Sequence, residues 1–488
     1  MTELKTSKQK IGTISADAYA LFVSANGELT SSGKAMDRAL QGSLSRAREQ
    51  ESFRAKAGNV LFYYTNSSET PRVLLASASP GETRVTQLRE AAFAAARSAQ
   101  KHRLQNLVIA FDPRNEEEVE AIAEGALSAT YSYERFKSEK LNRILNSITV
   151  LSAKKAERAA ERARISSEAA AIVRDLVNEP PNLLSSEKLA ETAKRIARED
   201  GLKIRIFEKS ELERMGANAF LSVGKGSEIP GRMVYLNYRP KGKPSAHVAI
   251  VGKGITFDSG GLSLKNEQQM LHMKSDMAGA ATSLGCVHGA ARLRLPVEVS
   301  ALMMLTENMP DGAANRPGDV VRAMQGKTIE ITNTDAEGRL ALADGLAYAE
   351  TLKPDYLIDV ATLTGAQIIG LGRLVGAVMG NNEKLIRKIV QAGEKSGETM
   401  WPLPLPEKYR DLIKSDAADV KNSSGIPEAG SIQAGLFLSE FVSHPAWVHL
   451  DIAGPSWQER EWSIYTKNAS GFGTRLLLTF LSNLSKES

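Results

Sequence analysis

The sequence predicts an α/β protein with a smaller N-terminal α/β domain, residues 1–165, and a larger C-terminal domain, residues 166–488, with a mainly parallel, helix-covered sheet. The chain has 488 residues, more than one ordinary core holds. A long helical pattern ends at Pro180 and Pro181, which break a helix and indicate a hinge. Beyond them, near-continuous apolar runs alternate with helical patterns, as in a parallel sheet covered on both faces.

The N-terminal part combines short apolar runs with helical periodicity. We expect strands at 59–64, 72–76 and 106–111, and helices at 35–49, 83–102 and 116–132. A helix rich in Ala, Glu and Arg is expected over 153–176, and basic residues clustered in 134–165 are expected on a solvated helix face.

The C-terminal part alternates more regularly. The expected strands are 202–207, 233–238, 247–251, 297–305, 329–332, 356–359 and 447–451. The expected helices are 186–199, 210–215, 278–293, 340–351, 382–396 and 432–442. Functional loops of such sheets lie at the carboxyl ends of strands. We therefore expect a functional loop over 253–258, directly after Val251, and a second functional segment after Thr332.

Composition narrows the class of protein. Hydrophobic residues make up 42% and charged residues 24% of the chain, as in globular proteins, and no apolar run is long enough to span a membrane. The polar N-terminus has no signal core and Cys286 is the single cysteine, so we expect a cytoplasmic protein. We expect Cys286 to be buried in the helix after Asp276. Nucleic-acid binding is an alternative that rests on the net charge of +5 alone.

Two segments carry most of the chemistry. Residues 333–340 read Asn-Thr-Asp-Ala-Glu-Gly-Arg-Leu, and residues 251–265, followed by 273–277, lie about sixty residues upstream. Together they supply Asp258, Asp276, Asp335, Glu337, Lys253, Lys265 and Arg339. Four carboxylates cannot share one pocket as anions unless cations neutralise them. The sequence therefore predicts a site for a pair of divalent metal ions, either Mn²⁺ or Zn²⁺, which activate a bridging water.

Spacing suggests how each group is used. Asp335 and Glu337 would point to the same side of an extended segment, with Gly338 turning into the following helix. Lys253 can lose its proton beside cations and become a nitrogen ligand. Structural alternatives are a helix N-cap for Asp335, a first-turn acid for Glu337 and a tight turn at Asp258.

Other reaction classes fit less well. Gly252-Lys253-Gly254 lacks the spacing of a phosphate-binding loop. None of the six histidines forms His-Glu-x-x-His, and no Gly-x-Ser-x-Gly motif is present, which disfavours those hydrolase schemes. A core or surface role is expected for His449. The remaining rivals are a dimetal phosphatase or nuclease and a DNA-binding protein that keeps an inactive hydrolase fold.

The motifs resemble those of the leucyl (cytosol) aminopeptidase family of dimetal exopeptidases. The resemblance rests on residues 333–340, 251–261 and 273–277, and on Thr306–Pro310, Arg316–Asp319, Ala361–Ala366, Asn178–Asn182 and His449–Gly454. It covers residues 165–488 strongly and the N-terminal part only in its size and general α/β pattern.

The resemblance implies a role for each matching residue. One metal ion would be held by Asp258, Asp335 and Glu337. The other would be held by Lys253, Asp258, Asp276 and Glu337. Lys265 and Arg339 would be catalytic, with a bicarbonate ion at Arg339, and the substrate would contact Met273, Thr362, Leu363 and Gly365.

The implied activity is metal-dependent hydrolysis of the N-terminal residue, leucine-like but broad, from peptides by a dimetal-bridged water. The family also implies a homohexamer. Residues 266–269, His272 and 468–471 depart from the family pattern, which leaves the substrate preference open.

Overall fold

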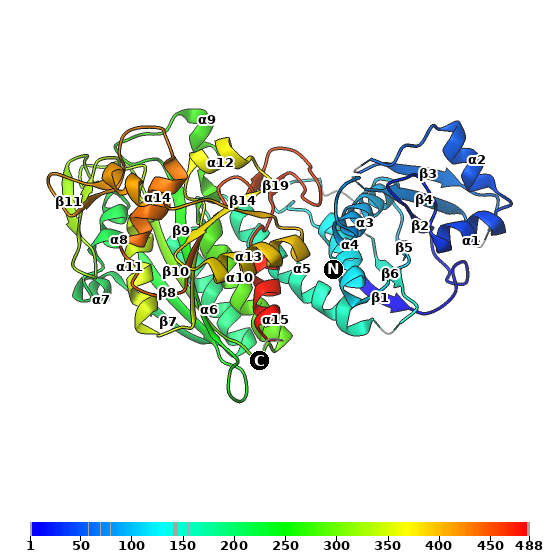
Figure 1. Cartoon of the computed structure of the whole chain (residues 1–488), viewed down its shortest axis with the longest axis horizontal. Coiled ribbons are helices and arrows are strands. Elements are labelled where there is room, and N and C mark those ends of the chain that lie inside the picture. Colours follow the sequence, from blue (N-terminus) through cyan, green and yellow to red (C-terminus); the bar gives the residue numbers. More distant parts are fainter. Residues whose placement is uncertain are drawn as a thin grey trace. The chain divides into compact units, whose positions relative to one another are not determined.

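The computed structural model describes residues 2–56, 58–68, 70–78, 80–139, 145–154 and 156–485. The chain forms two compact units: Met1–Glu168 with Arg460–Lys467, and Ala169–Glu459 with Asn468–Ser488. Each unit is built on its own sheet with flanking helices, so the predicted two-domain α/β class is confirmed (Figure 1). No helix within these described ranges is long and apolar enough to cross a membrane.

The first unit contains a six-stranded sheet in the order β1-β6-β5-β2-β4-β3, parallel except for the β3–β4 pair. Its strands are β1 Glu3–Ser7, β2 Ala18–Val23, β3 Val60–Tyr64, β4 Arg72–Ser77, β5 Asn106–Ala110 and β6 Ser147–Leu151. Its helices are α1 Ser31–Ala39, α2 Ser43–Gln50, α3 Arg84–Lys101 and α4 Glu116–Thr130. The predicted elements at β3, β4, β5, α3 and α4 are confirmed; β1, β2 and β6 were not predicted.

The single helix predicted over 35–49 is wrong. The chain forms α1 and α2, separated by Gln41 at φ 54° and Gly42 at φ 75°. A left-handed backbone ends a right-handed helix. The same helical periodicity runs through α1 and α2, so the sequence pattern did not reveal the break between them. The helix predicted over 153–176 is α5, Glu157–Asn178, which ends just before the two prolines. Basic residues were predicted to cluster in 134–165, and residues 140–144 and 155 of this range lie outside the described residues. Within the range, Arg162 forms ion pairs with Glu116 and Glu120.

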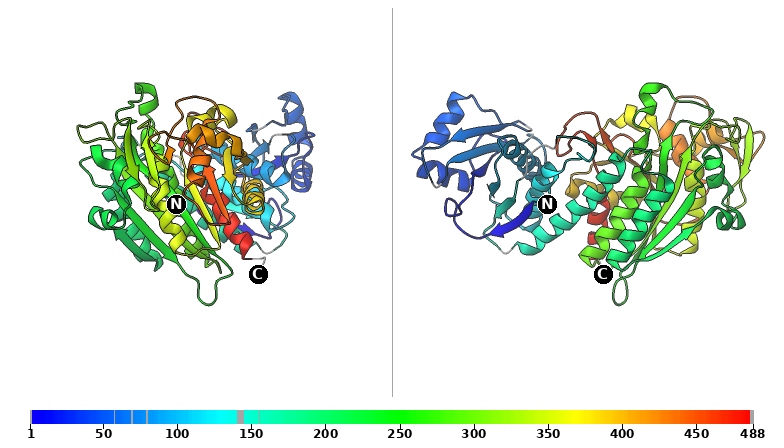
Figure 2. Two further views of the ribbon diagram at one scale, coloured as in Figure 1. Left: turned by 60° about the vertical axis from the view of Figure 1, so that its left-hand side comes forward. Right: turned by 180° about the vertical axis from the view of Figure 1, so that it is seen from behind.

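The second unit contains an eight-stranded sheet in the order β15-β14-β17-β13-β9-β10-β8-β7. Figure 2 shows helices packed along this sheet. Its strands are β7 Lys203–Phe207, β8 Arg232–Tyr238, β9 His247–Asp258, β10 Glu298–Asn308, β13 Tyr356–Ala361, β14 Gly376–Gly380, β15 Met400–Pro402 and β17 Trp447–Asp451. The central strands β17, β13, β9 and β10 are parallel. Two small sheets join β11 Asp319–Arg322, β12 Thr328–Ile331 and β16 Val420–Lys421, and β18 Trp457–Gln458 with β19 Asn468–Ala469.

The helices of the second unit agree with most predicted ranges. They are α6 Ser186–Asp200, α7 Lys209–Arg214, α8 Asn218–Val223, α9 Glu267–Met270, α10 Ala278–Leu293, α11 Gly338–Thr351, α12 Gly365–Leu371, α13 Glu383–Ser396, α14 Gly430–Ser439 and α15 Thr474–Leu484. Three 3-10 helices, η1 Gly224–Gly226, η2 Met273–Met277 and η3 Glu407–Ile413, complete the unit. Cys286 is buried in α10, as expected.

Strand β9 is packed between two helices. A Cβ added at Gly252 would lie 2.5 Å from Ala280 Cα of α10, whereas one added to Gly345 of α11 would lie 2.8 Å from Val251 Cγ1. Neighbouring residues of a strand point to opposite faces, so α10 covers the face of Gly252 and α11 covers the face of Val251 and Lys253.

The functional loop expected over 253–258 is wrong, because β9 continues through these residues to Asp258. The pairing with β10 extends to Asn308, with an irregularity in register between Thr306 and Asn308. The glycines that suggested a loop keep the strand clear of α10, where no side chain fits.

The signature segment, residues 332–340, also differs from the prediction. It follows β12, which lies in the small sheet with β11 and β16. Its residues form a turn in which Asn333 Oδ1 accepts from the Asp335 N–H at 2.9 Å, so the predicted extended segment is wrong. Gly338 is the first residue of α11, and the turn predicted there is also wrong.

We predict that Gly279→Ala destabilises the second unit. A Cβ there would lie 2.0 Å from Val360 O, a backbone atom that cannot move alone. We expect a loss of at least about 2 kcal/mol in the free energy of unfolding, measured by urea denaturation. Gly312→Ala is the control, since its Cβ meets nothing within 4 Å. Equal stability of the two variants would contradict this packing.

Candidate metal centre

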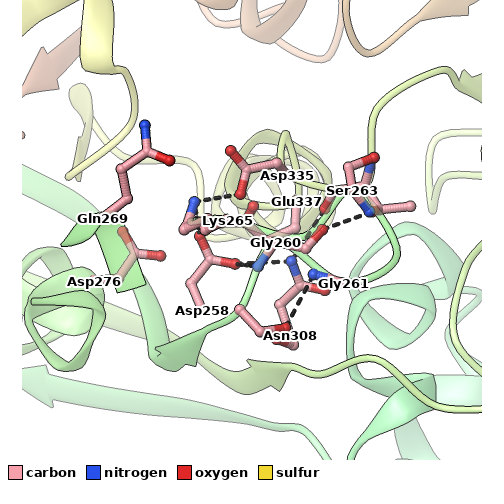
Figure 3. Close-up of polar contacts among 12 residues, drawn as sticks. Asp258, Gly260, Gly261, Ser263, Lys265, Gln269, Asp276, Asn308, Asp335 and Glu337 are labelled. Carbon is pink, nitrogen blue, oxygen red and sulfur yellow. Dashed lines mark hydrogen bonds and ion pairs between the residues drawn. The ribbon is translucent and has the colours of Figure 1, made fainter. Parts of the chain in front are cut away.

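Five charged residues of the two segments lie together in the second unit: Asp258, Lys265, Asp276, Asp335 and Glu337 (Figure 3). Asp258 ends β9, Asp276 lies in η2, and Asp335 and Glu337 lie just before α11. Carboxylate oxygens of Asp258, Asp335 and Glu337 lie within 4.8 Å of one another, an arrangement that can hold a metal ion. Asp276 is joined to this group through Lys253.

Lys253 joins two of the carboxylates. Its Nζ lies 2.9 Å from Asp276 Oδ1 and 2.8 Å from Glu337 Oε1, and it donates to the carbonyl of Thr362 at 3.1 Å. The side chain passes over Gly338, where an added Cβ would lie 2.6 Å from Lys253 Cε. Glycine opens α11 because the lysine occupies that space.

Lys265 neutralises the other side of the cluster. Its Nζ lies 2.7 Å from Asp258 Oδ2 and also pairs with Asp335 Oδ1. The side chain of Asp335 therefore faces Lys265, which contradicts the N-cap alternative; the residue before α11 is Glu337, whose side chain makes no cap. The tight-turn alternative at Asp258 is correct in part, because Asp258 Oδ1 accepts from the Gly260 N–H at 2.9 Å.

Burial governs the charges in this cluster. It raises the pKa of Asp276, Asp335 and Glu337, because the charged carboxylates lose water and face one another. Burial alone would lower the pKa of Lys253, but attraction to Asp276, Glu337 and Asp258 raises it overall. Lys253 therefore stays protonated as long as its ammonium group is the positive charge that neutralises these carboxylates.

The donor set fits divalent ions. Asp276 Oδ2 and Glu337 Oε2 are buried and have no hydrogen-bond partner in the part of the chain that the structure describes. Buried carboxylate oxygens without donors are costly unless a cation satisfies them. Two divalent ions would supply the charge that two ammonium groups only partly provide.

Two side chains that were given no role in the sequence analysis bind the segments together. Asn308 Nδ2 donates to Asp258 Oδ1 at 2.8 Å and to the carbonyl of Thr334 at 3.1 Å. The Thr334 hydroxyl accepts from the Ser263 N–H at 2.8 Å and donates to the Gly260 carbonyl at 2.6 Å. The only signal in the sequence was that Asn308 belongs to the motif 306–310 and Thr334 to the motif 333–340.

Arg339 lies in the first turn of α11 and is buried. Its Nη1 donates to the carbonyl of Asn422 at 2.6 Å, and its Nε has no hydrogen-bond partner among the described residues. Burial lowers the pKa of Arg339 to about 10. A buried guanidinium with a free donor can hold a small anion.

The candidate substrate residues flank the same cluster. The Thr362 hydroxyl donates to Asp276 Oδ1 at 2.7 Å, and the Leu363 N–H donates to Asp451 Oδ1 at 3.1 Å. Gly365 begins α12, and Met273 begins η2, three residues before Asp276. His449 has the expected core role: it is fully buried on β17, where Nδ1 bonds Asp359 Oδ1 at 2.5 Å.

Comparison with known proteins defines the class. Residues 171–478 match the cytosol aminopeptidase family, catalytic domain, and residues 20–140 match the N-terminal domain of that family. The probable cytosol aminopeptidase of Persephonella marina is 39% identical over 461 residues, 92% of this chain and 93% of the relative. The chain therefore belongs to the cytosol aminopeptidase family, whose members are metal-dependent hydrolases.

Solved structures agree. A mutant of tomato leucine aminopeptidase has a TM-score of 0.90 at 32% identity, covering 99% of this chain and 97% of its own. The bottromycin maturation enzyme BotP in complex with Mn has a TM-score of 0.85 at 33% identity, covering 96% of this chain and 100% of its own. Both likenesses support a metal-dependent aminopeptidase, a hydrolase.

We predict that Gly338→Ala separates folding from activity. The new methyl group meets the flexible end of Lys253 rather than backbone, so the lysine moves and α11 still forms. We expect kcat/KM on a leucyl anilide to fall about 10- to 100-fold, with the free energy of unfolding within about 1 kcal/mol of the unaltered protein. Gly312→Ala is again the control. Unchanged kcat/KM would contradict the placement of Lys253.

Proposed function

We propose that this chain removes N-terminal residues from peptides, leucine-like residues first but with a broad range, using two divalent ions and a water that bridges them. The convergence of the buried Asp258, Asp276 and Glu337 with the half-buried Asp335 in one cluster carries the proposal. Crowding four carboxylates in this way is tolerable only when cations neutralise them, and two lysines neutralise them only in part.

The residues around the cluster suggest two ion sites. Asp258, Asp335 and Glu337 would hold one ion, and Lys253, Asp258, Asp276 and Glu337 the other. Lys253 would release its proton to bind, because a metal ligand must have a free lone pair. Bound ions supply charge that lowers the pKa of a water and stabilises a developing oxyanion. Oxygen ligands with one nitrogen accept Mn²⁺ or Zn²⁺.

Lys265 and Arg339 would act on the reacting groups. Lys265 Nζ already faces Asp258 and Asp335, so it would donate to the oxygen of the scissile carbonyl and stabilise its negative charge. Arg339 has an Nε without a partner among the described residues and would hold a bicarbonate ion, which accepts the proton of the attacking water.

Substrate recognition would use the loops beside the cluster. Met273, Thr362, Leu363 and Gly365 would receive the first side chain and the peptide backbone. The N-terminal amine would add a neutral nitrogen to the ion site, and an internal peptide bond has no such group. We expect a blocked peptide to resist cleavage for this reason.

Two further proposals concern assembly and location. We propose a homohexamer in the cytoplasm, supported by the membership of the cytosol aminopeptidase family and by a single buried cysteine.

We predict that Glu337→Gln removes activity together with bound metal. Glutamine keeps the shape of the side chain but loses its charge, so the shared ligand is lost. We expect at least about a 100-fold lower rate on a leucyl anilide and fewer than two ions per chain by elemental analysis. Asp311→Asn, at an exposed carboxylate, should keep both, and N-acetyl-leucyl anilide should not be cleaved by any variant. A Glu337→Gln protein with full rate and full metal content would refute the proposal.

We predict that Lys265→Met lowers turnover and leaves the bound ions in place. Methionine keeps the length of the side chain but cannot donate to an oxyanion. We expect kcat to fall about 100- to 1,000-fold with unchanged metal content. Lys327→Met, which breaks an ion pair with Glu440 elsewhere in the unit, serves as the control. Turnover equal to that of the unaltered protein would remove Lys265 from catalysis.

A further inference from the structure

Asn422 directly follows the short strand β16, and its side chain is fully buried. Strand β16 runs parallel to β12, with Val420 opposite Ile329, so Asn422 lies beside the segment that leaves β12. None of the motifs in the sequence analysis contains it.

The carboxamide of Asn422 contacts the signature segment at five points. Its Oδ1 accepts from the N–H of Thr332 at 2.9 Å, from the Thr332 hydroxyl at 3.2 Å and from the N–H of Asn333 at 3.3 Å. Its Nδ2 donates to the carbonyls of Asn333 at 2.7 Å and of Ala336 at 3.3 Å. Every donor and acceptor of the side chain is therefore used on residues 332–336.

These contacts replace a missing strand partner. Residues 332–336 lie between β12 and α11, and among the described strands none pairs with them in a ladder. Buried backbone groups need hydrogen bonds, and a primary amide supplies both donors and acceptors at once. Asn422 thus supplies this turn with the backbone hydrogen bonds that a neighbouring strand supplies to β12.

The same residue also holds Arg339, through its backbone carbonyl at 2.6 Å from Nη1. Asn308 also holds the segment, by donating to the carbonyl of Thr334. The turn that carries Asp335 and Glu337 is therefore held by two buried carboxamides.

We propose that Asn422 is a positioning residue that sets the affinity of the site for divalent ions by fixing the backbone of Asp335 and Glu337. The inference rests on the proposed function, in which both carboxylates bind the ions. Residues that orient metal ligands commonly change metal affinity or activity about 10- to 100-fold when they are replaced.

The substitution Asn422→Asp tests this role. Aspartate has the same shape and keeps the acceptor for Thr332 and Asn333, but it places an oxygen against the carbonyls of Asn333 and Ala336. The matched control is Asn315→Asp, at a buried asparagine of the same unit. Its Nδ2 donates to Ser222 Oγ at 3.0 Å, and among the described residues its side chain forms no hydrogen bond to the segment.

The experiment titrates each metal-free, folded protein with Mn²⁺ by calorimetry and measures hydrolysis of a leucyl anilide at increasing Mn²⁺. We expect Asn422→Asp to bind Mn²⁺ at least about 10-fold more weakly than the unaltered protein and to regain turnover in excess Mn²⁺. Asn315→Asp should bind Mn²⁺ as the unaltered protein does, because a general loss of stability does not change ion affinity in folded protein.

A folded Asn422→Asp protein with unchanged Mn²⁺ affinity overturns the inference. If this variant does not fold, Thr332→Val tests the inference. It keeps the side-chain shape, removes the hydroxyl contacts to Asn422 Oδ1 and to the neighbouring Ser423 carbonyl, and should weaken Mn²⁺ binding about 3- to 10-fold. Unchanged affinity there also overturns the inference. An unaltered protein that neither binds Mn²⁺ nor hydrolyses the anilide instead refutes the proposed function.

Discussion

The crowding of four carboxylates, three of them buried, around two lysines is the constraint that organises the second unit. Asp258 and Lys253 come from β9, Asp276 from η2, and Asp335 and Glu337 from the turn before α11. Desolvated carboxylates repel one another, so this arrangement requires cations at the centre. Lys253 and Lys265 each contact two of the carboxylates, and the unsatisfied oxygens of Asp276 and Glu337 show where further positive charge fits.

Close backbone packing brings these groups together. Gly252 lets α10 approach β9, and Gly338 leaves room for the lysine that crosses the start of α11. The site is therefore built on a central strand and on the beginnings of helices, which hold side chains more firmly than long loops do. This explains the glycines on both sides of Lys253 and directly after Glu337.

Neutral polar residues complete the site. Asn308 and Asn422 both donate hydrogen bonds to the signature segment. Thr362 connects Lys253 with Asp276. These contacts join the ion site to the loop that would receive the substrate, so a change in one part should affect the others. Buried polar networks of this kind stabilise one arrangement of ligands because each donor already has its acceptor.

The sequence alone determined the two-domain α/β class, the charged residues of the site and the family, because apolar periodicity and the short acidic motifs are local signals. It did not determine the extension of β9 to Asp258, the turn at Asn333 or the start of α11 at Gly338. Glycine permits strand, turn and helix alike, and the neighbouring Ala280 and Lys253 select among them. Tertiary structure alone assigned Asn422 its partners, since its five contacts join residues about ninety positions apart, a distance over which no periodicity operates.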